Sequence, residues 1–268
     1  LSCLVGSEMC IRDSLGIIFG WQILELSFNI LYVSSGGLTA LLAIYCLFVF
    51  PSFKTETGQL KKLVIRRRYW LYYALQFLSG ARRQIFVVFA GFMMVEKFGF
   101  EVHQLTALFL VNLVINIFAA PLFGYFVAFF GERRALLIEY SGLIFVFLAY
   151  GGIYIFDWGV MLAATLFVLD HLFFGLRMAL KTYFQKISAP EDIAPTAAVA
   201  FTINHIAAVF LPVFLGLLWL VSPALVFIIA AFIAFLSFLL ALLVPRFPDN
   251  GKETLSIFQF SPKSENGL

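Results

Sequence analysis

Residues 70–95 read WLYYALQFLSGARRQIFVVFAGFMMV, and the pentapeptide GARRQ, Gly80 to Gln84, lies in the middle of this apolar run. The run is long enough for a transmembrane helix, which needs about 20 mostly apolar residues. Arg82 and Arg83 therefore lie near the centre of a predicted membrane span. Inserting an arginine at this depth of the bilayer costs about 2.5 kcal/mol of free energy or more. We therefore expect each arginine to face protein, water or a ligand.

The composition indicates that the rest of the chain is also embedded in a membrane. Hydrophobic residues make up 62% of the chain and charged residues only 12%, with a mean hydropathy of +0.99. Soluble domains carry about 25% charged residues. The composition thus predicts an all-α polytopic membrane protein.

No stretch of the sequence carries a catalytic or metal-binding motif. The three cysteines have no disulfide or metal-site spacing. Nucleotide-binding loops, zinc-protease motifs and hydrolase elbows are absent from the sequence. We therefore expect no cofactor, no bound metal and no enzymatic activity. The basic loop at residues 52–68 is short and lies next to a span, so it predicts contact with membrane lipids rather than nucleic acid.

Apolar runs predict seven full spans, at residues 29–50, 69–95, 104–130, 135–156, 158–185, 196–221 and 223–244. Basic residues concentrate in alternate loops, and the connector at 52–68 is the most basic of them. By the positive-inside rule, this connector and the tail at 246–268 are predicted to be cytoplasmic. We expect the polar tail to be disordered.

The start of the chain differs in character from the remainder. Residues 1–14, LSCLVGSEMCIRDS, break abruptly into the apolar sequence LGIIFGW. The segment is not a signal peptide, because no basic start leads into an apolar core. We interpret residues 1–14 as a non-native, linker-like segment and residues 15–27 as the tail of a truncated membrane helix.

The hairpin from Gln104 to Arg134 ends in GYFVAFFGERR, residues 124–134. This ending resembles the cytoplasmic signature loop of the major facilitator superfamily, in which Gly, an acidic and a basic residue precede a Gly and two basic residues. Gly124, Gly131, Arg133 and Arg134 stand at matching places. Ala128 and Phe129 replace the acidic residue and the basic residue after it. The four matching residues are the candidate gating loop.

The resemblance implies a domain organisation. Residues 15–51 correspond to the end of the N-terminal half, about one and a half helices, and 52–68 to the central cytoplasmic loop. Residues 69–245 correspond to the six-helix C-terminal half, helices 7–12. The missing N-terminal half would then belong to the same protein and pack against this part as its partner. We therefore do not expect the given chain to transport by itself.

The resemblance also implies a function. It predicts a multi-pass permease of the bacterial inner membrane, that is, a proton-coupled secondary transporter working by alternating access. The two arginines favour a small anionic solute. Two rivals are a non-transporting receptor or scaffold on the same fold and a membrane-embedded enzyme using Asp170, His171 and His205.

Polar residues from four predicted helices reach one layer of the membrane. Arg82 is about twelve residues into its helix, or ~18 Å from the membrane surface, near the midplane where such transporters bind substrate. The predicted substrate-binding residues are Arg82, Arg83, Gln84, Asn112, Asn116, Asp170 and Asn204. The predicted proton-coupling residues are Asp170, His171 and His205.

Each of these polar residues also has a structural alternative. Arg82 or Arg83 would pair with Asp170 and lock two helices together, with one arginine facing a cavity and the other a neighbouring helix. Asn112 and Asn116 would form hydrogen bonds across helices. The spacing of Asp170, Phe174, Arg177 and Lys181 predicts one stripe facing an inner vestibule.

Overall fold

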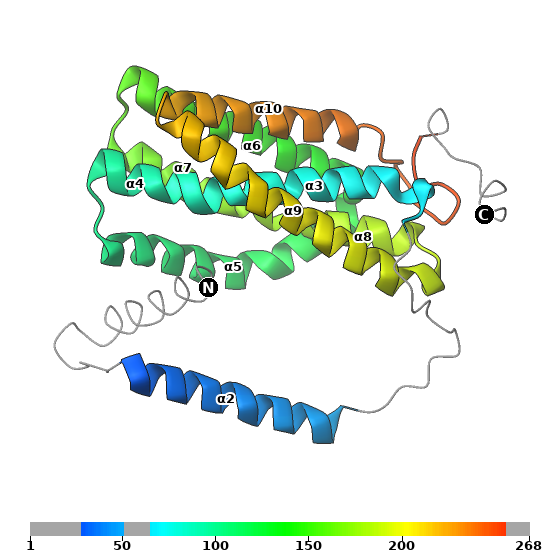
Figure 1. Ribbon diagram of the computed structural model, residues 1–268. Coiled ribbons are helices and arrows are strands. Elements are labelled where there is room, and N and C mark those ends of the chain that lie inside the picture. The colour runs from blue at the N-terminus through cyan, green and yellow to red at the C-terminus, as the bar shows by residue number, and fades with distance from the viewer. Residues whose placement is uncertain (1–27, 51–64, 256–268) are drawn as a thin grey trace. The chain divides into compact units, whose positions relative to one another are not determined.

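The computed structural model describes residues 28–50 and 65–255, and within them every named element is helical (Figure 1). The α-helices are α2 (Phe28–Val49), α3 (Trp70–Gln84), α4 (Gly91–Phe98), α5 (Val102–Phe130), α6 (Glu132–Phe156), α7 (Val160–Gly175), α8 (Met178–Ile187), α9 (Ile193–Trp219) and α10 (Pro223–Ala241). Two 3₁₀ turns, η1 (Arg67–Tyr69) and η3 (Pro190–Asp192), and a π-helical turn, η2 (Ile85–Ala90), complete the set. The linker-like residues 1–14, the truncated helix at 15–27 and most of the connector lie outside the described residues.

Seven helical segments within the described residues are long and apolar enough to cross a membrane. They are Tyr32–Val49, Arg67–Phe98, Val102–Phe130, Glu132–Phe156, Val160–Ile187, Pro190–Trp219 and Pro223–Ala241. Each coincides with one of the predicted spans. The all-α class and the seven candidate spans are therefore confirmed.

The described residues divide into two units. The first comprises residues 28–50 and 100–110. In its helix α2, the hydroxyl of Thr39 donates to the carbonyl of Ser35 (2.8 Å), so this polar group is satisfied within the helix. The second unit comprises residues 65–99 and 111–255 and contains all the predicted site residues.

The second unit is a bundle in which α6 packs along α10, and α3 packs along α9 (Figure 1). Its buried core includes large aromatic side chains such as Tyr140, Tyr183 and Phe167. Many large apolar side chains instead point outward, among them Phe145 on α6 and Phe214 on α9. A soluble protein rarely exposes so much apolar surface, and lipid is the solvent that suits it.

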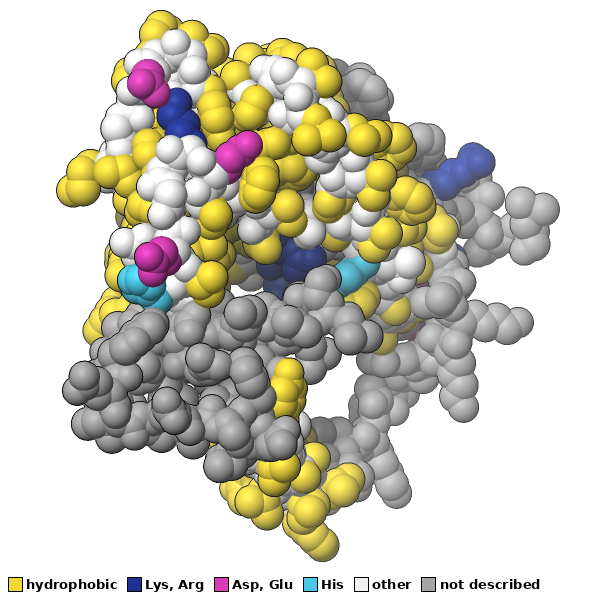
Figure 2. All heavy atoms as spheres, turned by 60° about the vertical axis from the view of Figure 1, so that its left-hand side comes forward, with side chains coloured by type: hydrophobic (Ala, Val, Ile, Leu, Met, Phe, Trp, Pro, Cys, Tyr) yellow, Lys and Arg dark blue, Asp and Glu magenta, His cyan; other side chains and the backbone are white. Residues whose placement is uncertain are grey.

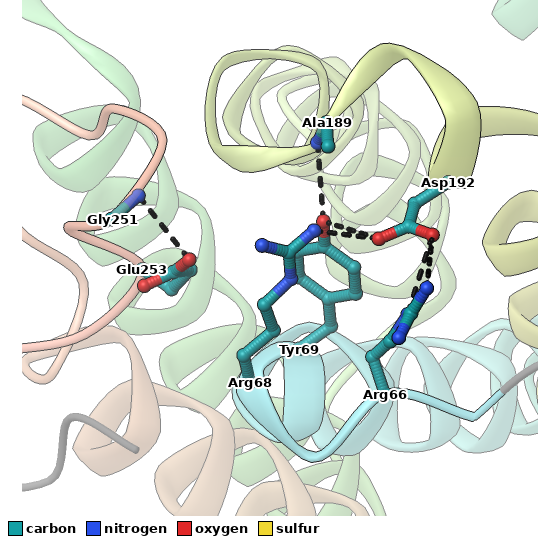
Figure 3. A network of polar contacts seen from close by, with 7 residues as sticks. All are labelled: Arg66, Arg68, Tyr69, Ala189, Asp192, Gly251 and Glu253. Atoms are coloured by element: carbon teal, nitrogen blue, oxygen red, sulfur yellow. Dashed lines mark hydrogen bonds and ion pairs between the residues drawn. The ribbon is translucent and has the colours of Figure 1, made fainter. Parts of the chain in front are cut away.

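A buried carboxylate ties the start of α3 to the start of α9 (Figure 3). Asp192 is 1% exposed and accepts hydrogen bonds from Arg66 Nε (3.3 Å), Arg68 Nη2 (2.6 Å) and Tyr69 Oη (3.2 Å). Tyr69 Oη in turn accepts the backbone N–H of Ala189 (3.1 Å). Because two guanidinium groups compensate the acid, its burial is tolerated. We call this end of the unit, where α3 begins and α8 and α10 end, the basic end.

Replacing Asp192 by asparagine should lower the free energy of unfolding of the second unit by about 1.5–3 kcal/mol, the usual value of hydrogen bonds to charged groups. The change keeps the shape of the side chain but removes the negative charge that Arg66 and Arg68 contact. Thermal unfolding in detergent, followed by loss of helical circular dichroism, measures the effect. Glu191→Gln is the matched control, because Glu191 is adjacent and exposed. Equal melting of the two variants would contradict this role.

The beginning of the C-terminal tail is ordered, contrary to the expectation of disorder for residues 246–268. Asp249 and Lys252 form an isolated bridge, and Glu253 and Thr254 are buried. The hydroxyl of Tyr183 on α8 donates to the carbonyl of Glu253, and the N–H of Leu255 donates to the carbonyl of Leu243 (3.0 Å). These hydrogen bonds to the backbone hold a polar segment whose composition alone predicts no structure. Residues 256–268 lie outside the described part of the chain.

Candidate functional site

The two adjacent arginines of α3 point to different surroundings. Arg82 is 1% exposed; its guanidinium lies over the ring of Tyr140 (4.3 Å) and its Nη2 is 3.6 Å from Oε1 of Glu139. Its Nε donates to the carbonyl of Leu78 (3.3 Å). Arg83 is half-buried and lines a cavity. Arg82 is thus packed against α6, whereas Arg83 is available to a ligand.

Glu139, the ion-pair partner of Arg82, is a residue that the sequence reasoning missed. It is fully buried on α6, and neither carboxylate oxygen has a hydrogen-bond partner among the described residues. It lies seven residues after Glu132, or about 10 Å along the helix, in the apolar context LLIEYSGL. A charged residue inside a membrane span is a candidate functional residue, and this rule selects Glu139 as well as Arg82.

Asp170 forms no ion pair with Arg82 or Arg83 within the described residues. The structural alternative, in which one of these arginines pairs with Asp170 and holds two helices together, is therefore not observed. Asp170 is 2% exposed, and its Oδ2 is buried without a hydrogen-bond partner. The predicted stripe is split: Phe174, Arg177 and Lys181 line cavities, whereas Asp170 is not among the lining residues.

The first cavity has a volume of about 420 Å³ and lies between α3, α8 and α9. Three basic side chains line it: Arg83, Arg177 and Lys181. Tyr72 and Phe184 form a stacked aromatic wall, with ring centroids 4.3 Å apart. The remaining polar lining residues are Gln76, Gln185, Asn204 and His205.

The second cavity, of about 320 Å³, shares Arg177 and Lys181 with the first. Asn116 of α5 and His171 of α7 lie on its wall. No aspartate or glutamate among the described residues lines either cavity. Figure 2 shows basic side chains and a histidine recessed among hydrophobic ones on the face it views. The two cavities together therefore present a positively charged, partly apolar environment.

Two irregular turns flank the basic residues of these cavities. The π-helical turn η2 begins at Ile85, directly after Arg83 and Gln84. The span 160–187 is interrupted at Leu176–Arg177, where the N–H of Arg177 donates to the carbonyl of Phe174 (3.1 Å) in a tighter turn. π-turns are frequent at functional sites, and broken helices line the sites of many transporters. Neither interruption is indicated by a proline or glycine pair in the sequence.

The other predicted binding residues occupy different environments. Asn204 lines the first cavity, and its Nδ2 donates to the carbonyl of Gln76 (3.0 Å), linking α9 to α3. Asn112 is 1% exposed, and neither its amide oxygen nor its amide nitrogen has a partner within the described residues. Gln84 is half-buried and is not among the residues that line the two cavities. Nδ1 of His205 lies 2.9 Å from the carbonyl of Phe201.

The predicted gating loop lies at the basic end. Gly131 has φ +83°, a left-handed conformation that favours glycine, and it joins α5 to α6. Arg133 and Arg134 follow in the first turn of α6 and line a third cavity. Gly124 lies within α5 with nothing within 4 Å of an added Cβ. Gly131, Arg133 and Arg134 thus line one cavity, whereas Gly124 is not among its lining residues.

No family model matches the chain, and no curated protein matches it. Within the described residues, no group of three or more histidine, cysteine, aspartate or glutamate side chains is placed to hold a metal ion. A function is therefore inferred from the cavities and their charges, with the sequence resemblance as its only family-level support.

Proposed function

We propose that this chain is part of a secondary active transporter of the major-facilitator type that binds a small anionic solute in the first cavity. One observation carries the proposal: Arg83, Arg177 and Lys181 line a cavity that has no acidic residue on its described wall. Charged groups inside a membrane bundle are costly, and such groups usually mark a substrate pathway. An anion in the cavity would offset their charge.

The chemistry of the three cations favours a carboxylate or a phosphate. A guanidinium offers two parallel N–H donors to the two oxygens of such a group, while an ammonium acts as a point charge. In a cavity of low dielectric these contacts are stronger than in water. The stacked rings of Tyr72 and Phe184 would hold an apolar part of the same solute.

The proposal includes proton coupling and a bacterial inner-membrane location. Asp170 would carry the proton, together with His171, which lines the second cavity, or His205, which lines the first. By the positive-inside rule the basic end would be cytoplasmic. Alternating access would then open the cavities to the two sides of the membrane in turn.

Replacing Arg83 by glutamine is expected to weaken anion binding at least about tenfold, because the cavity loses a charge and its two-pronged donor. Arg83→Lys should give an intermediate loss, since it keeps the charge alone. Calorimetric titration of the detergent-purified chain with phosphate, sulfate and a dicarboxylate measures the affinities, with choline as the cationic comparison.

Arg67→Gln is the matched control for this titration, because Arg67 is exposed at the start of the same span and does not line the first cavity. Its anion affinity should equal that of the parent chain. The proposal fails if the folded chain binds none of the three anions, or if Arg83→Gln binds them unchanged. Binding retained without any solute flux after reconstitution together with the N-terminal half that the resemblance implies would favour the receptor alternative.

A further inference from the structure

The third cavity, of about 630 Å³, lies at the basic end. Its wall is formed by the end of α5, the Gly131 turn, the first turn of α6, Lys186 of α8 and residues 246–248 after α10. It shares no lining residue with the first or second cavity among the described residues. We propose that this cavity binds the phosphate group of an anionic phospholipid.

The charge of this cavity is unbalanced. Its basic lining residues are Arg133, Arg134, Lys186 and Arg246, and the acid among its described lining residues is Glu132. Glu132 is 3% exposed and pairs with Lys186, with Nζ and Oε1 2.6 Å apart. Within the described residues the three arginines have no acidic partner. The acid is therefore already neutralised, and an anion entering the cavity meets three guanidinium groups.

The backbone adds to this preference. Gly131, with φ +83°, turns the chain directly into α6, so the first turn of that helix borders the cavity. The first N–H groups of a helix have no acceptor within the helix and carry a partial positive charge. A phosphate has enough oxygens to accept from several guanidinium and backbone donors at once.

Aromatic side chains on the same wall distinguish a lipid from a soluble phosphate. Phe129, Phe130 and Phe247 line the cavity and are 71%, 42% and 85% exposed. A dissolved phosphate would gain nothing from these rings. A phospholipid would set its phosphate on the arginines and its acyl chains against the rings, since basic pockets at this level of a bundle suit lipid head groups. The proposal needs only that the bundle spans a membrane, and it stands without the proposed transport function.

Lipid titration of the detergent-purified chain, read by native mass spectrometry, tests this site. Dioleoyl phosphatidylglycerol should bind at least about tenfold more tightly than dioleoyl phosphatidylcholine, whose head group carries no net charge. The double variant Arg133→Gln/Arg246→Gln should lose this preference. Lys252→Gln, which removes one charge from the same C-terminal segment outside the cavity, should keep it.

Two additional measurements separate lipid binding from a folding defect and from binding of free phosphate. The variant Arg133→Lys/Arg246→Lys keeps the positive charge and should retain most of the preference, which separates loss of charge from loss of folding. Glycerol phosphate, the head group without acyl chains, should compete only weakly. The proposal is overturned if the glutamine double variant keeps the lipid preference, or if glycerol phosphate or inorganic phosphate binds as tightly as the lipid.

Discussion

Replacing Glu139 by leucine is expected to destabilise the second unit by about 3–5 kcal/mol, the usual cost of removing one partner from a buried ion pair. Arg82 and Glu139 are both buried, at 1% and 0% exposure, and their charged groups are 3.6 Å apart. Without Glu139, the guanidinium of Arg82 has no ion-pair partner among the described residues and no access to solvent. Equilibrium unfolding in mixed micelles, followed by helical circular dichroism, measures the loss.

The double variant Arg82→Met/Glu139→Leu is the informative control. Replacing both partners of a buried ion pair by apolar residues of similar volume is often neutral or stabilising. The double variant should therefore be more stable than Glu139→Leu, although it carries one more substitution. If both variants are equally unstable, the acid acts through shape or through another partner rather than through the charge of Arg82.

Replacing Gly80 by alanine is expected to lower the free energy of unfolding by about 3 kcal/mol, at the upper end of the usual cost of overpacking. A Cβ at this position would clash with the backbone oxygen of Asn204 and lie 3.0 Å from its carbonyl carbon. These are backbone atoms, so α3 and α9 must separate before the methyl group fits. The separation would also strain the hydrogen bond from Asn204 to the carbonyl of Gln76. Thermal unfolding by circular dichroism measures the effect.

Gly216→Ala is the matched control for Gly80→Ala. Gly216 is also a helical glycine, on α9, but an added Cβ there would have nothing within 4 Å. Alanine is better than glycine inside a helix by about 0.5–1 kcal/mol, so this variant should melt at or slightly above the parent temperature. A Gly80→Ala chain that melts with the parent would mean that the two helices are not in close contact at this point.

The seven spans were predictable because each apolar run is near the length that a bilayer requires. The sequence indicates less clearly where a span is interrupted. The π-turn at Ile85–Ala90 lies in an apolar run without glycine or proline, so no local helix breaker marks it. The break at Leu176–Arg177 follows Gly175 directly, but glycine is common within membrane helices and does not by itself predict a break.

The candidate site was predictable in part. Depth along the helices selected several residues that the structure places on cavity walls, such as Arg83, Asn116 and Asn204. It could not tell that Arg82 points away from those cavities, because a difference of one residue rotates a side chain by about 100°. Glu139, the partner of Arg82, was missed although it lies about 10 Å along its helix in an apolar context, where the rule for charges inside a membrane span also applies.

The shared wall of the first two cavities has a consequence for how many anions the chain can hold. Arg177 and Lys181 contribute to both cavities. An anion bound in one cavity would offset the positive charge of Arg177 and Lys181, which an anion in the other cavity also needs. Two bound anions would also repel each other across the shared wall. Under the proposed function, occupancy would therefore be mutually exclusive: the two cavities would be alternative binding places for a single anion, with Arg177 and Lys181 between them.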